Sequence, residues 1–221
     1  MRKISFAIGE YYHIYNRGVD KRSIFTDKYD LERFFQSMIE FNSVECIGSI
    51  YENSFKSELG NSIPKLVEFV AYCLNPNHYH FILKPLQDKG IEKFMHKLGS
   101  GYTNYFNEKY DRSGSLFQGS YKAVHVDSNT QLLHLSVYVN LNNRIDEPTK
   151  NVFDLSKSSF NEYVNNTQET SVICSKGIIL DQFKSTMAYL RFAEDSWKDI
   201  LFRKSLEKDI SDYLGTKLPS A

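Results

Sequence analysis

Alternating and helical patterns of apolar residues divide the first part of the chain into strands and helices. Residues 11–18 alternate and stop at Gly18, which predicts a strand followed by a turn. Residues 27–44 place apolar side chains at helical spacing, and Asp27 is suited to cap the start of that helix. Residues 65–76 and 78–85 predict two strands joined through Pro76 and Asn77, and therefore an antiparallel hairpin. Further helices are predicted at 91–110, where Ser100 and Gly101 could introduce a bend, and at 129–144 after a short strand at 122–128.

The order of these elements is strand, helix, hairpin, helix, strand, helix. It predicts an α+β fold, a ferredoxin-like antiparallel sheet with helices on one face. Residues 47–65 are polar and rich in turn formers, so a loop is expected there. Beyond about residue 150 the pattern changes, and residues 181–215 predict two or three amphipathic helices. We therefore expect a core domain of residues 1–149 and a C-terminal helical extension of residues 150–221.

Composition narrows the class of protein. The 27 Lys and Arg residues are balanced by 27 Asp and Glu residues, so any contact with nucleic acid must come from a local arrangement of charge. The three cysteines are far apart, which argues against a disulfide framework or a zinc knuckle and favours a reducing compartment. The start of the sequence has no apolar run of the length that a signal peptide or membrane span needs. A soluble cytoplasmic protein is expected, with no membrane partner.

Two histidines, His78 and His80, stand one residue apart within the apolar segment "CLNPNHYHFIL". Alternate residues of a strand share a face, so both imidazoles point the same way. Unpaired buried imidazoles are costly, and imidazole nitrogen is a common metal ligand. A metal site is therefore favoured over a pair of hydrogen-bonded core histidines. The motif alone is weak, because cupins, amidohydrolases and phosphoesterases use similar pairs.

The helix predicted at 129–144 offers partners for these histidines. Gln131, His134, Tyr138 and Asn142 follow one another at steps of three or four and form one row. That row either faces solvent or faces the histidine pair. In the second case the Asn142 amide oxygen completes a set of three ligands, and Tyr138 is a phenol beside a cation. A phenol with a pKa near 10 needs such help to act as a nucleophile, and this donor set suits Mg²⁺ or Mn²⁺ at a phosphate better than structural zinc.

Four segments together resemble a known family. They are "YHIYNRG", "CLNPNHYHFIL", "YTNYFNEKYDRSGSLFQGSYKAV" and "YVNLNN", in this order and spacing, and they cover roughly residues 10–145. They are similar to the REP-associated tyrosine transposases, a branch of the single-tyrosine HUH transposases related to those of the insertion-sequence-200 type. The resemblance implies that residues 1–149 form an HUH nuclease domain on a ferredoxin-like core.

The resemblance also implies an activity and its residues. Such enzymes are metal-dependent endonucleases and strand transferases that cut single-stranded DNA beside hairpins, through a 5′-phosphotyrosine intermediate. Tyr138 corresponds to the nucleophile, His78 and His80 to the two histidine ligands, and Asn142 to a third ligand. The chain departs from the family pattern at Asn143, where Pro is usual, at Asn75, where Met is common, and at Ser120, where Arg is common.

DNA contacts are expected chiefly at phosphates. The candidates are Arg17, Lys21, Arg22, Arg112, Gln118, Lys122 and Arg144, of which Lys122 and Arg112 rank highest. Gln118 suits either a base edge or a backbone cap in its loop. His13 is interpreted as a hydrogen-bonded core histidine, and His134 as a residue that borders the site without a catalytic role. Tyr102 and Tyr105 are expected to pack in the core rather than to stack on bases.

Two other functions use the same residues. A domesticated, non-catalytic descendant would bind hairpin DNA without cutting it. A metal-dependent phosphoesterase would use water as nucleophile, which leaves the glycine-rich block around Gln118 unexplained. The sequence is compatible with either a monomer or a homodimer.

Overall fold

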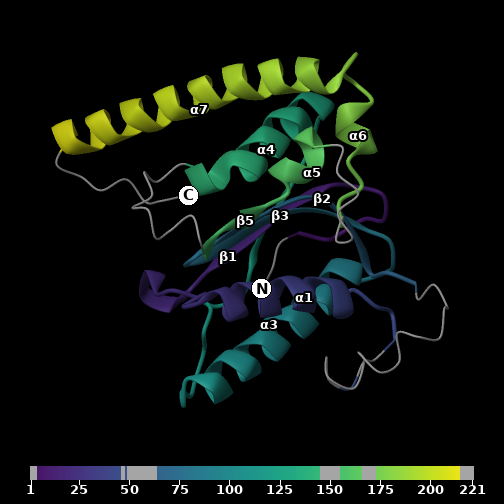
Figure 1. Cartoon of the computed structure of the whole chain (residues 1–221), viewed down its shortest axis with the longest axis vertical. Coiled ribbons are helices and arrows are strands. Elements are labelled where there is room, and N and C mark those ends of the chain that lie inside the picture. The colour runs from purple at the N-terminus through teal and green to yellow at the C-terminus, as the bar shows by residue number, and fades with distance from the viewer. Residues whose placement is uncertain (1–3, 46–47, 49–63, 145–154, 166–172, 215–221) are drawn as a thin grey trace.

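The structure, a computed structural model, describes residues 4–45, 48, 64–144, 155–165 and 173–214. Its centre is a five-stranded antiparallel sheet in the order β4-β1-β3-β2-β5 (Figure 1). The strands are β1 (Tyr12–Arg17), β2 (Val67–Asn75), β3 (His78–Pro85), β4 (Lys122–His125) and β5 (Lys157–Ser158). The first four strands have the ferredoxin-like order, so the predicted fold class is confirmed. The predicted loop at 47–65 lies almost wholly outside the described residues.

The described helices lie between the strands and after the last of them. They are α1 (Lys28–Glu40), α3 (Gly90–Lys109), α4 (Asn129–Leu141), α5 (Phe160–Val164), α6 (Gly177–Leu180) and α7 (Thr186–Leu214), with 3₁₀ turns at Val19–Lys21 and Asn142–Arg144. Asp27 caps α1 as predicted, because its Oδ1 accepts from the Asp30 backbone N–H at 2.9 Å. Ser128 caps α4 by accepting from the Gln131 N–H at 3.2 Å.

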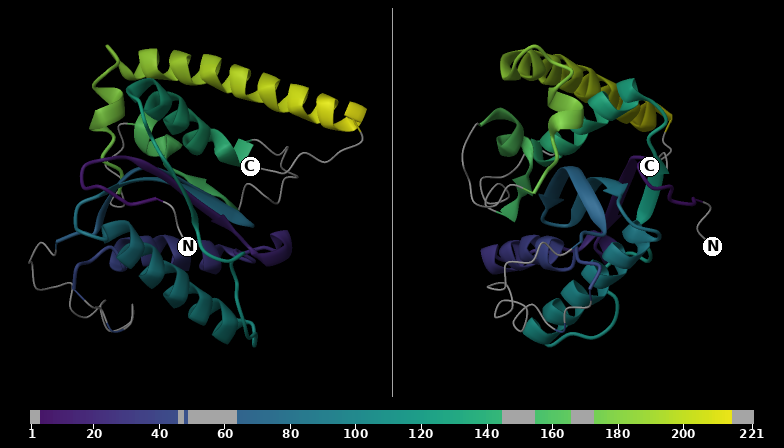
Figure 2. Two further views of the ribbon diagram at one scale, coloured as in Figure 1. Left: turned by 180° about the vertical axis from the view of Figure 1, so that it is seen from behind. Right: turned by 90° about the vertical axis from the view of Figure 1, so that its right-hand side faces the viewer.

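The helices cover both faces of the sheet, which corrects one detail of the prediction. The helices α1 and α3 lie on one face, as expected, and pack a core that includes Phe34, Phe81 and Tyr102 (Figure 2). The helix α4 lies on the opposite face, where α5 and α7 join it. Its leucines and valines point in several directions, so α4 is stable only between two apolar surfaces, the sheet and α7.

The pair Ser100 and Gly101 does not interrupt α3, which runs as one helix from Gly90 to Lys109. A Cβ atom at position 101 would lie 2.6 Å from the Phe41 ring. The glycine therefore permits close packing between α3 and the end of α1, and no bend is needed to explain it.

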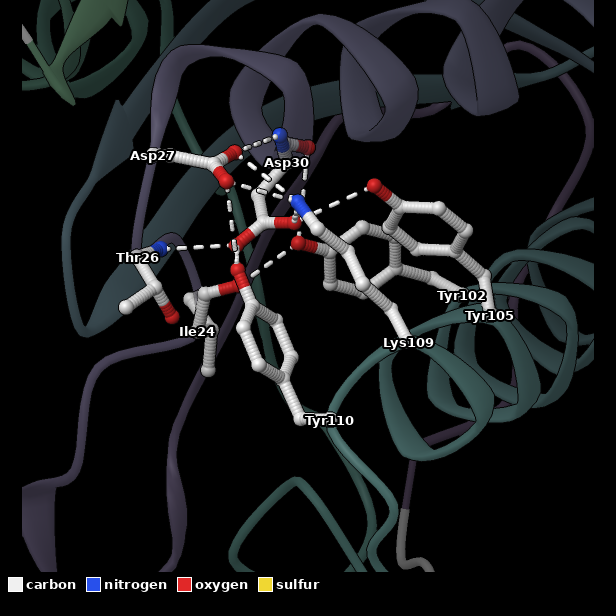
Figure 3. A network of polar contacts seen from close by, with 8 residues as sticks. All are labelled: Ile24, Thr26, Asp27, Asp30, Tyr102, Tyr105, Lys109 and Tyr110. Atoms are coloured by element: carbon white, nitrogen blue, oxygen red, sulfur yellow. Dashed lines mark hydrogen bonds and ion pairs between the residues drawn. The ribbon is translucent and has the colours of Figure 1, made fainter.

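A buried ionic network joins α1 to the end of α3 (Figure 3). Asp30 is 0% exposed, and Lys109 contacts its Oδ1 at 2.7 Å. The Asp30 carboxylate also accepts from the hydroxyls of Tyr105 at 3.1 Å and Tyr110 at 2.8 Å. These contacts supply the hydrogen bonds that a buried carboxylate requires. Tyr102 is fully buried and donates to the Ile24 carbonyl, which agrees with its predicted place in the core.

The C-terminal segment packs on the same sheet. The stretch expected to form two or three helices is mainly one long helix, α7. β5 pairs with β2, and Tyr163 and Tyr189 are buried together with Val70 and Ile82 of the sheet. The described part of the extension therefore completes the core beneath α4, while the predicted boundary at residues 149 and 150 lies outside the described residues. No described helix has an apolar stretch long enough to cross a membrane.

Candidate active site

The hairpin of β2 and β3 places the two motif histidines on the face that α4 covers. The strand register pairs His80 with Tyr15 of β1 and Cys73 of β2, and pairs His78 with Arg17 and Asn75. The two imidazole rings are perpendicular, with centroids 5.2 Å apart. The prediction that His78 and His80 share a face is confirmed by this geometry.

His78 is held by its hydrogen-bond partners. Its Nδ1 lies 2.6 Å from the side-chain oxygen of Asn77, which can only accept, so we place the ring proton on Nδ1. Its Nε2 then carries a lone pair. That lone pair lies 3.0 Å from Oδ1 of Asn142 and 2.9 Å from Nδ2 of Asn75. A fixed tautomer with an unprotonated Nε2 is the form in which imidazole binds a metal.

His13 approaches His80 from the neighbouring strand β1. The Nε2 atom of His13 lies 2.9 Å from Nδ1 of His80, and the two rings are stacked at 5.1 Å between centroids. Burial lowers the pKa of His13 to about 4. Burial, followed by the nearby His13 and His78, also lowers the pKa of His80 well below its usual value. Both imidazoles are therefore neutral near pH 7.

His13 is thus part of the site, although the sequence favoured a core role. With His80 Nδ1–H donating to His13, the Nε2 of His80 is left with a lone pair. The alternation of residues 11–18 placed His13 on the face of Tyr15 and Arg17. The missing information was the register between β1 and β3, which decides that His13 reaches His80.

Helix α4 brings Tyr138 and Asn142 to the histidines, which is the second of the two orientations that the sequence left open for this row. The Tyr138 ring stands perpendicular to His80 at 5.5 Å between centroids and to His13 at 6.1 Å. Asn142 follows the last turn of α4 and is only 5% exposed. The nucleophile candidate and the third ligand candidate therefore come from the same chain as the histidine pair.

The other half of the row faces away from the site. Gln131 and His134 are exposed. Gln131 accepts from the Asp127 backbone N–H at 2.8 Å, and His134 contacts the Ser196 hydroxyl of α7 at 3.1 Å. The row that spacing predicted as a unit is therefore divided: Gln131 and His134 stay exposed, whereas Tyr138 and Asn142 face the histidines of the sheet.

A buried polar network fixes α4 between the two candidate residues. Asn140 is fully buried and donates to the Tyr189 hydroxyl of α7 at 3.0 Å. Its Oδ1 accepts from the Ser159 hydroxyl at 2.6 Å. Ser159 in turn accepts from the Tyr72 backbone N–H of β2 at 2.9 Å. These bonds link the C-terminal half of α4 to the sheet and to α7, so the position of Tyr138 depends on the C-terminal segment.

A pocket of about 380 Å³ lies beside His78, His80 and Tyr138. Its walls come from β1, the 3₁₀ turn after it, the β2–β3 turn, β3, the loop that contains Gln118, β4 and α4. The lining residues are Tyr15, Asn16, Arg17, Lys21, Asn77, His78, His80, Gln118, Lys122 and Tyr138. The pocket thus joins both motif histidines and the candidate nucleophile to three cations, Arg17, Lys21 and Lys122.

The predicted DNA-contacting residues divide into two groups. Arg17, Lys21, Gln118 and Lys122 line the pocket; Arg17 donates to the Gln118 side chain, and Lys122 lies 5.8 Å from the centre of the Tyr15 ring. The second group comprises residues outside the lining, namely Arg22, Arg112 and Arg144. Each of these side chains contacts another residue of the protein: Arg22 donates to the Val19 carbonyl, Arg112 donates to the Asn107 side chain, and Arg144 lies over the Phe160 ring.

The donor atoms present fit a divalent cation that prefers nitrogen and oxygen ligands. Among the described residues, no three His, Cys, Asp or Glu side chains are grouped to hold a metal, and the donor atoms nearest Nε2 of His78 belong to amide side chains. His78 Nε2 and Asn142 Oδ1 are 3.0 Å apart. Two adjacent ligands of an octahedral ion at about 2.1 Å are separated by about 3 Å, so these two atoms already have the spacing of a ligand pair.

Comparison with known proteins agrees with this picture. The family model described as "Transposase IS200 like" matches residues 8–142, which include both motif histidines, Tyr138 and Asn142. The chain therefore belongs to the IS200-like transposase family. No curated protein matches the sequence.

A solved structure has a similar fold. It is a REP-associated tyrosine transposase bound to a REP hairpin, with 14% sequence identity and a TM-score of 0.51. The match covers 80% of this chain and 92% of the other. The likeness therefore extends over most of both chains and shows that they share a fold.

Proposed function

We propose that this protein is a metal-dependent nuclease and strand transferase that cuts single-stranded DNA beside a hairpin. Tyr138 is the nucleophile, and His78, His80 and Asn142 hold a Mg²⁺ or Mn²⁺ ion. The observation that supports this most directly is the convergence of Tyr138 and Asn142 from α4 on the two histidines of β3.

The reaction needs a nucleophile, a leaving group and a balance of protons. The Tyr138 oxygen forms a bond to phosphorus while the bond from phosphorus to the 3′-oxygen breaks, which leaves a 5′-phosphotyrosine and a free 3′-OH. The phenol gives up one proton and the leaving oxygen takes up one. Because one phosphodiester is exchanged for another, rejoining is the same step in reverse and needs no ATP. The bound cation would polarise the phosphodiester and favour the phenolate.

The chain's own residues prepare this step. His13 and Asn77 contact Nδ1 of His80 and of His78, and so fix the tautomers that leave Nε2 of each ring unprotonated. Arg17, Lys21 and Lys122 supply positive charge for the DNA phosphates on the pocket wall, despite the neutral net charge of the chain. Arg22, Arg112 and Arg144 remain candidates for contacts further along the DNA.

The similar transposase structure contains a REP hairpin, which supports hairpin DNA as the partner of this chain. Specificity would then come from the shape of the hairpin and from unpaired bases in the strand beside it. Gln118, which lines the pocket beside Arg17, is the candidate for contact with a base edge.

The test is formation of a covalent adduct. Full-length protein is incubated with Mn²⁺ and a labelled single-stranded oligonucleotide that contains a hairpin, and the products are separated under denaturing conditions. Tyr138→Phe should form no adduct and still bind the hairpin. Tyr29→Phe is the matched control, because Tyr29 is 74% exposed on α1, and it should form the adduct normally.

Other outcomes identify the competing functions. An adduct that persists in Tyr138→Phe would exclude this nucleophile. Hairpin binding without cleavage in the presence of any divalent metal would identify a non-catalytic binding protein. Cleavage of small phosphoesters without an adduct would instead indicate a phosphoesterase that uses water.

A further inference from the structure

Asn75, the last residue of β2, places its side-chain amide between two of the proposed ligands. It is 5% exposed. Its Nδ2 lies 2.8 Å from Oδ1 of Asn142 and 2.9 Å from Nε2 of His78. Those two atoms are 3.0 Å from each other. The three atoms thus form a closed triangle at the centre of the site.

The hydrogens in this triangle have one consistent arrangement. His78 carries its ring proton on Nδ1, toward Asn77, so its Nε2 is an acceptor. The Asn142 oxygen is also an acceptor, and two acceptors 3.0 Å apart, one buried and one partly buried, need a donor between them. The NH₂ group of Asn75 has two hydrogens and gives one to each. It therefore engages the same lone pairs that a bound cation would engage.

The other end of the amide is weakly held. Oδ1 of Asn75 contacts Sγ of Cys73 at 3.9 Å, and a thiol is a weak donor. A half-turn of the planar amide about its Cβ–Cγ bond exchanges the oxygen and the nitrogen at almost unchanged positions. That turn gives up the thiol contact and the two hydrogen bonds of the NH₂ group, and it brings an oxygen to the place where the NH₂ group lies. A cation bound by His78 and Asn142 would take up the same lone pairs and would attract that oxygen.

We infer, on the basis of the proposed function, that Asn75 is a further ligand of the cation, through Oδ1. Without a cation the amide directs NH₂ toward His78 and Asn142, and with a cation it directs oxygen toward the ion. Amide oxygen suits Mg²⁺ and Mn²⁺, and the triangle sides of 2.8, 2.9 and 3.0 Å match the spacing of adjacent ligands in an octahedral site.

The experiment measures metal binding without DNA. Mn²⁺ is titrated into the full-length protein and free Mn²⁺ is followed by electron paramagnetic resonance. The variants are Asn75→Asp, which keeps an oxygen ligand of the same shape but cannot donate, and Asn75→Leu, which keeps the size and removes the ligand. Asn107→Asp and Asn107→Leu are matched controls, because Asn107 lies on α3 and bonds to the Gly114 carbonyl. His78→Ala removes one of the proposed histidine ligands and so tests whether Mn²⁺ binds at this site at all.

A ligand role predicts opposite effects at position 75. Asn75→Leu should weaken Mn²⁺ binding by about tenfold or more, and Asn75→Asp should bind at least as tightly as the wild type. Equal weakening by both variants would show that the amide acts as a hydrogen-bond donor, and an unchanged Asn75→Leu would show that it has no role. Either result overturns the inference. If His78→Ala binds Mn²⁺ like the wild type, or the wild type binds none, the metal site of the proposed function fails as well.

A second measurement uses only the wild-type protein, so it does not depend on whether a variant folds. In ¹⁵N-labelled wild-type protein, the side-chain NH₂ signals of Asn75 should shift when Mg²⁺ is added, because the group turns away from His78. The NH₂ signals of Asn107 should stay in place. Asn75 signals that do not respond to saturating Mg²⁺ would contradict the inference.

Discussion

The Nε2 atom of His13 on β1 lies 2.9 Å from Nδ1 of His80 on β3. This contact occupies Nδ1 of His80, so Nε2 is the nitrogen that would bind the proposed cation. In metal sites, a partner of this kind sets the tautomer and the orientation of the ligand, and its loss typically lowers metal affinity by about 10- to 100-fold. His13 therefore acts as a positioning residue for His80.

The first prediction concerns this contact. His13→Leu should weaken Mn²⁺ binding by about tenfold or more, since His80 loses the partner that fixes its ring, and His13→Gln should recover part of the loss by restoring an acceptor. The measurement is the Mn²⁺ titration in the absence of DNA. His134→Leu is the control, because His134 contacts α7 on the far side of α4. Equal affinities for wild type and His13→Leu would exclude a positioning role.

The second prediction concerns the assembly of the site. Tyr138 stands 5.5 Å from His80 of its own chain, measured between ring centroids. If the reaction uses this arrangement, a mixture of His78→Ala and Tyr138→Phe should form no DNA adduct, because neither chain has a complete site. Adduct formation in the mixture, with neither variant active alone, would show that a tyrosine from one chain serves the histidines of another.

The third prediction concerns the cations of the pocket. Lys122→Gln and Lys21→Gln should each weaken hairpin binding, and each should reduce the slope of log affinity against log salt by about 0.7 to 0.9 if one phosphate contact is lost. Lys122 and Lys21 line the pocket, whereas Arg112 is held against Asn107 and Phe106. Arg112→Gln should therefore have a smaller effect, although the sequence ranked it with Lys122. A larger effect of Arg112→Gln would place the DNA path along the loop at 111–115.

Strands, helices and most of the ligand candidates could be predicted because they depend on local patterns. His78 and His80 share a face by strand alternation alone, and Tyr138 and Asn142 share one by helical spacing. The roles of His13 and Asn75 depend on strand register and on the distance from β2 to α4, which no local pattern specifies. The placement of α4 on the second face depends on α7, a segment that the sequence motifs do not include. Arg112 and Lys122 lie at similar distances from the glycine-rich block in the sequence, and only the fold separates them.

The last prediction concerns the ionic network that joins α1 to α3. Burial raises the pKa of Asp27. The hydrogen bonds from Lys109 and from the Asp30 backbone N–H, together with the charge of Lys109, lower the pKa by more than burial raises it, so the net shift is downward. The pKa of Lys109 is raised, because its hydrogen bonds to Asp27 and Asp30 outweigh the effect of burial, so it stays charged at acidic pH. The unfolded chain, with an Asp pKa of about 3.9, binds more protons at acidic pH than the folded chain does.

Stability contributed by Asp27 is therefore fully present above about pH 5 and is lost as the pH falls through about 4 toward the lowered pKa of the folded state. We expect the free energy of unfolding of the wild type to exceed that of Asp27→Asn at pH 7 and the difference to shrink with acidification. Because the Asp27 side chain is 42% exposed, the part of this difference that comes from the ion pair should not exceed about 1 kcal/mol. Urea unfolding at a series of pH values measures it. Asp195→Asn serves as control, since Asp195 pairs with Lys198 in an exposed position on α7 and should show a much smaller pH-dependent difference. A difference at Asp27 that grows on acidification would mean that its pKa is raised in the folded protein.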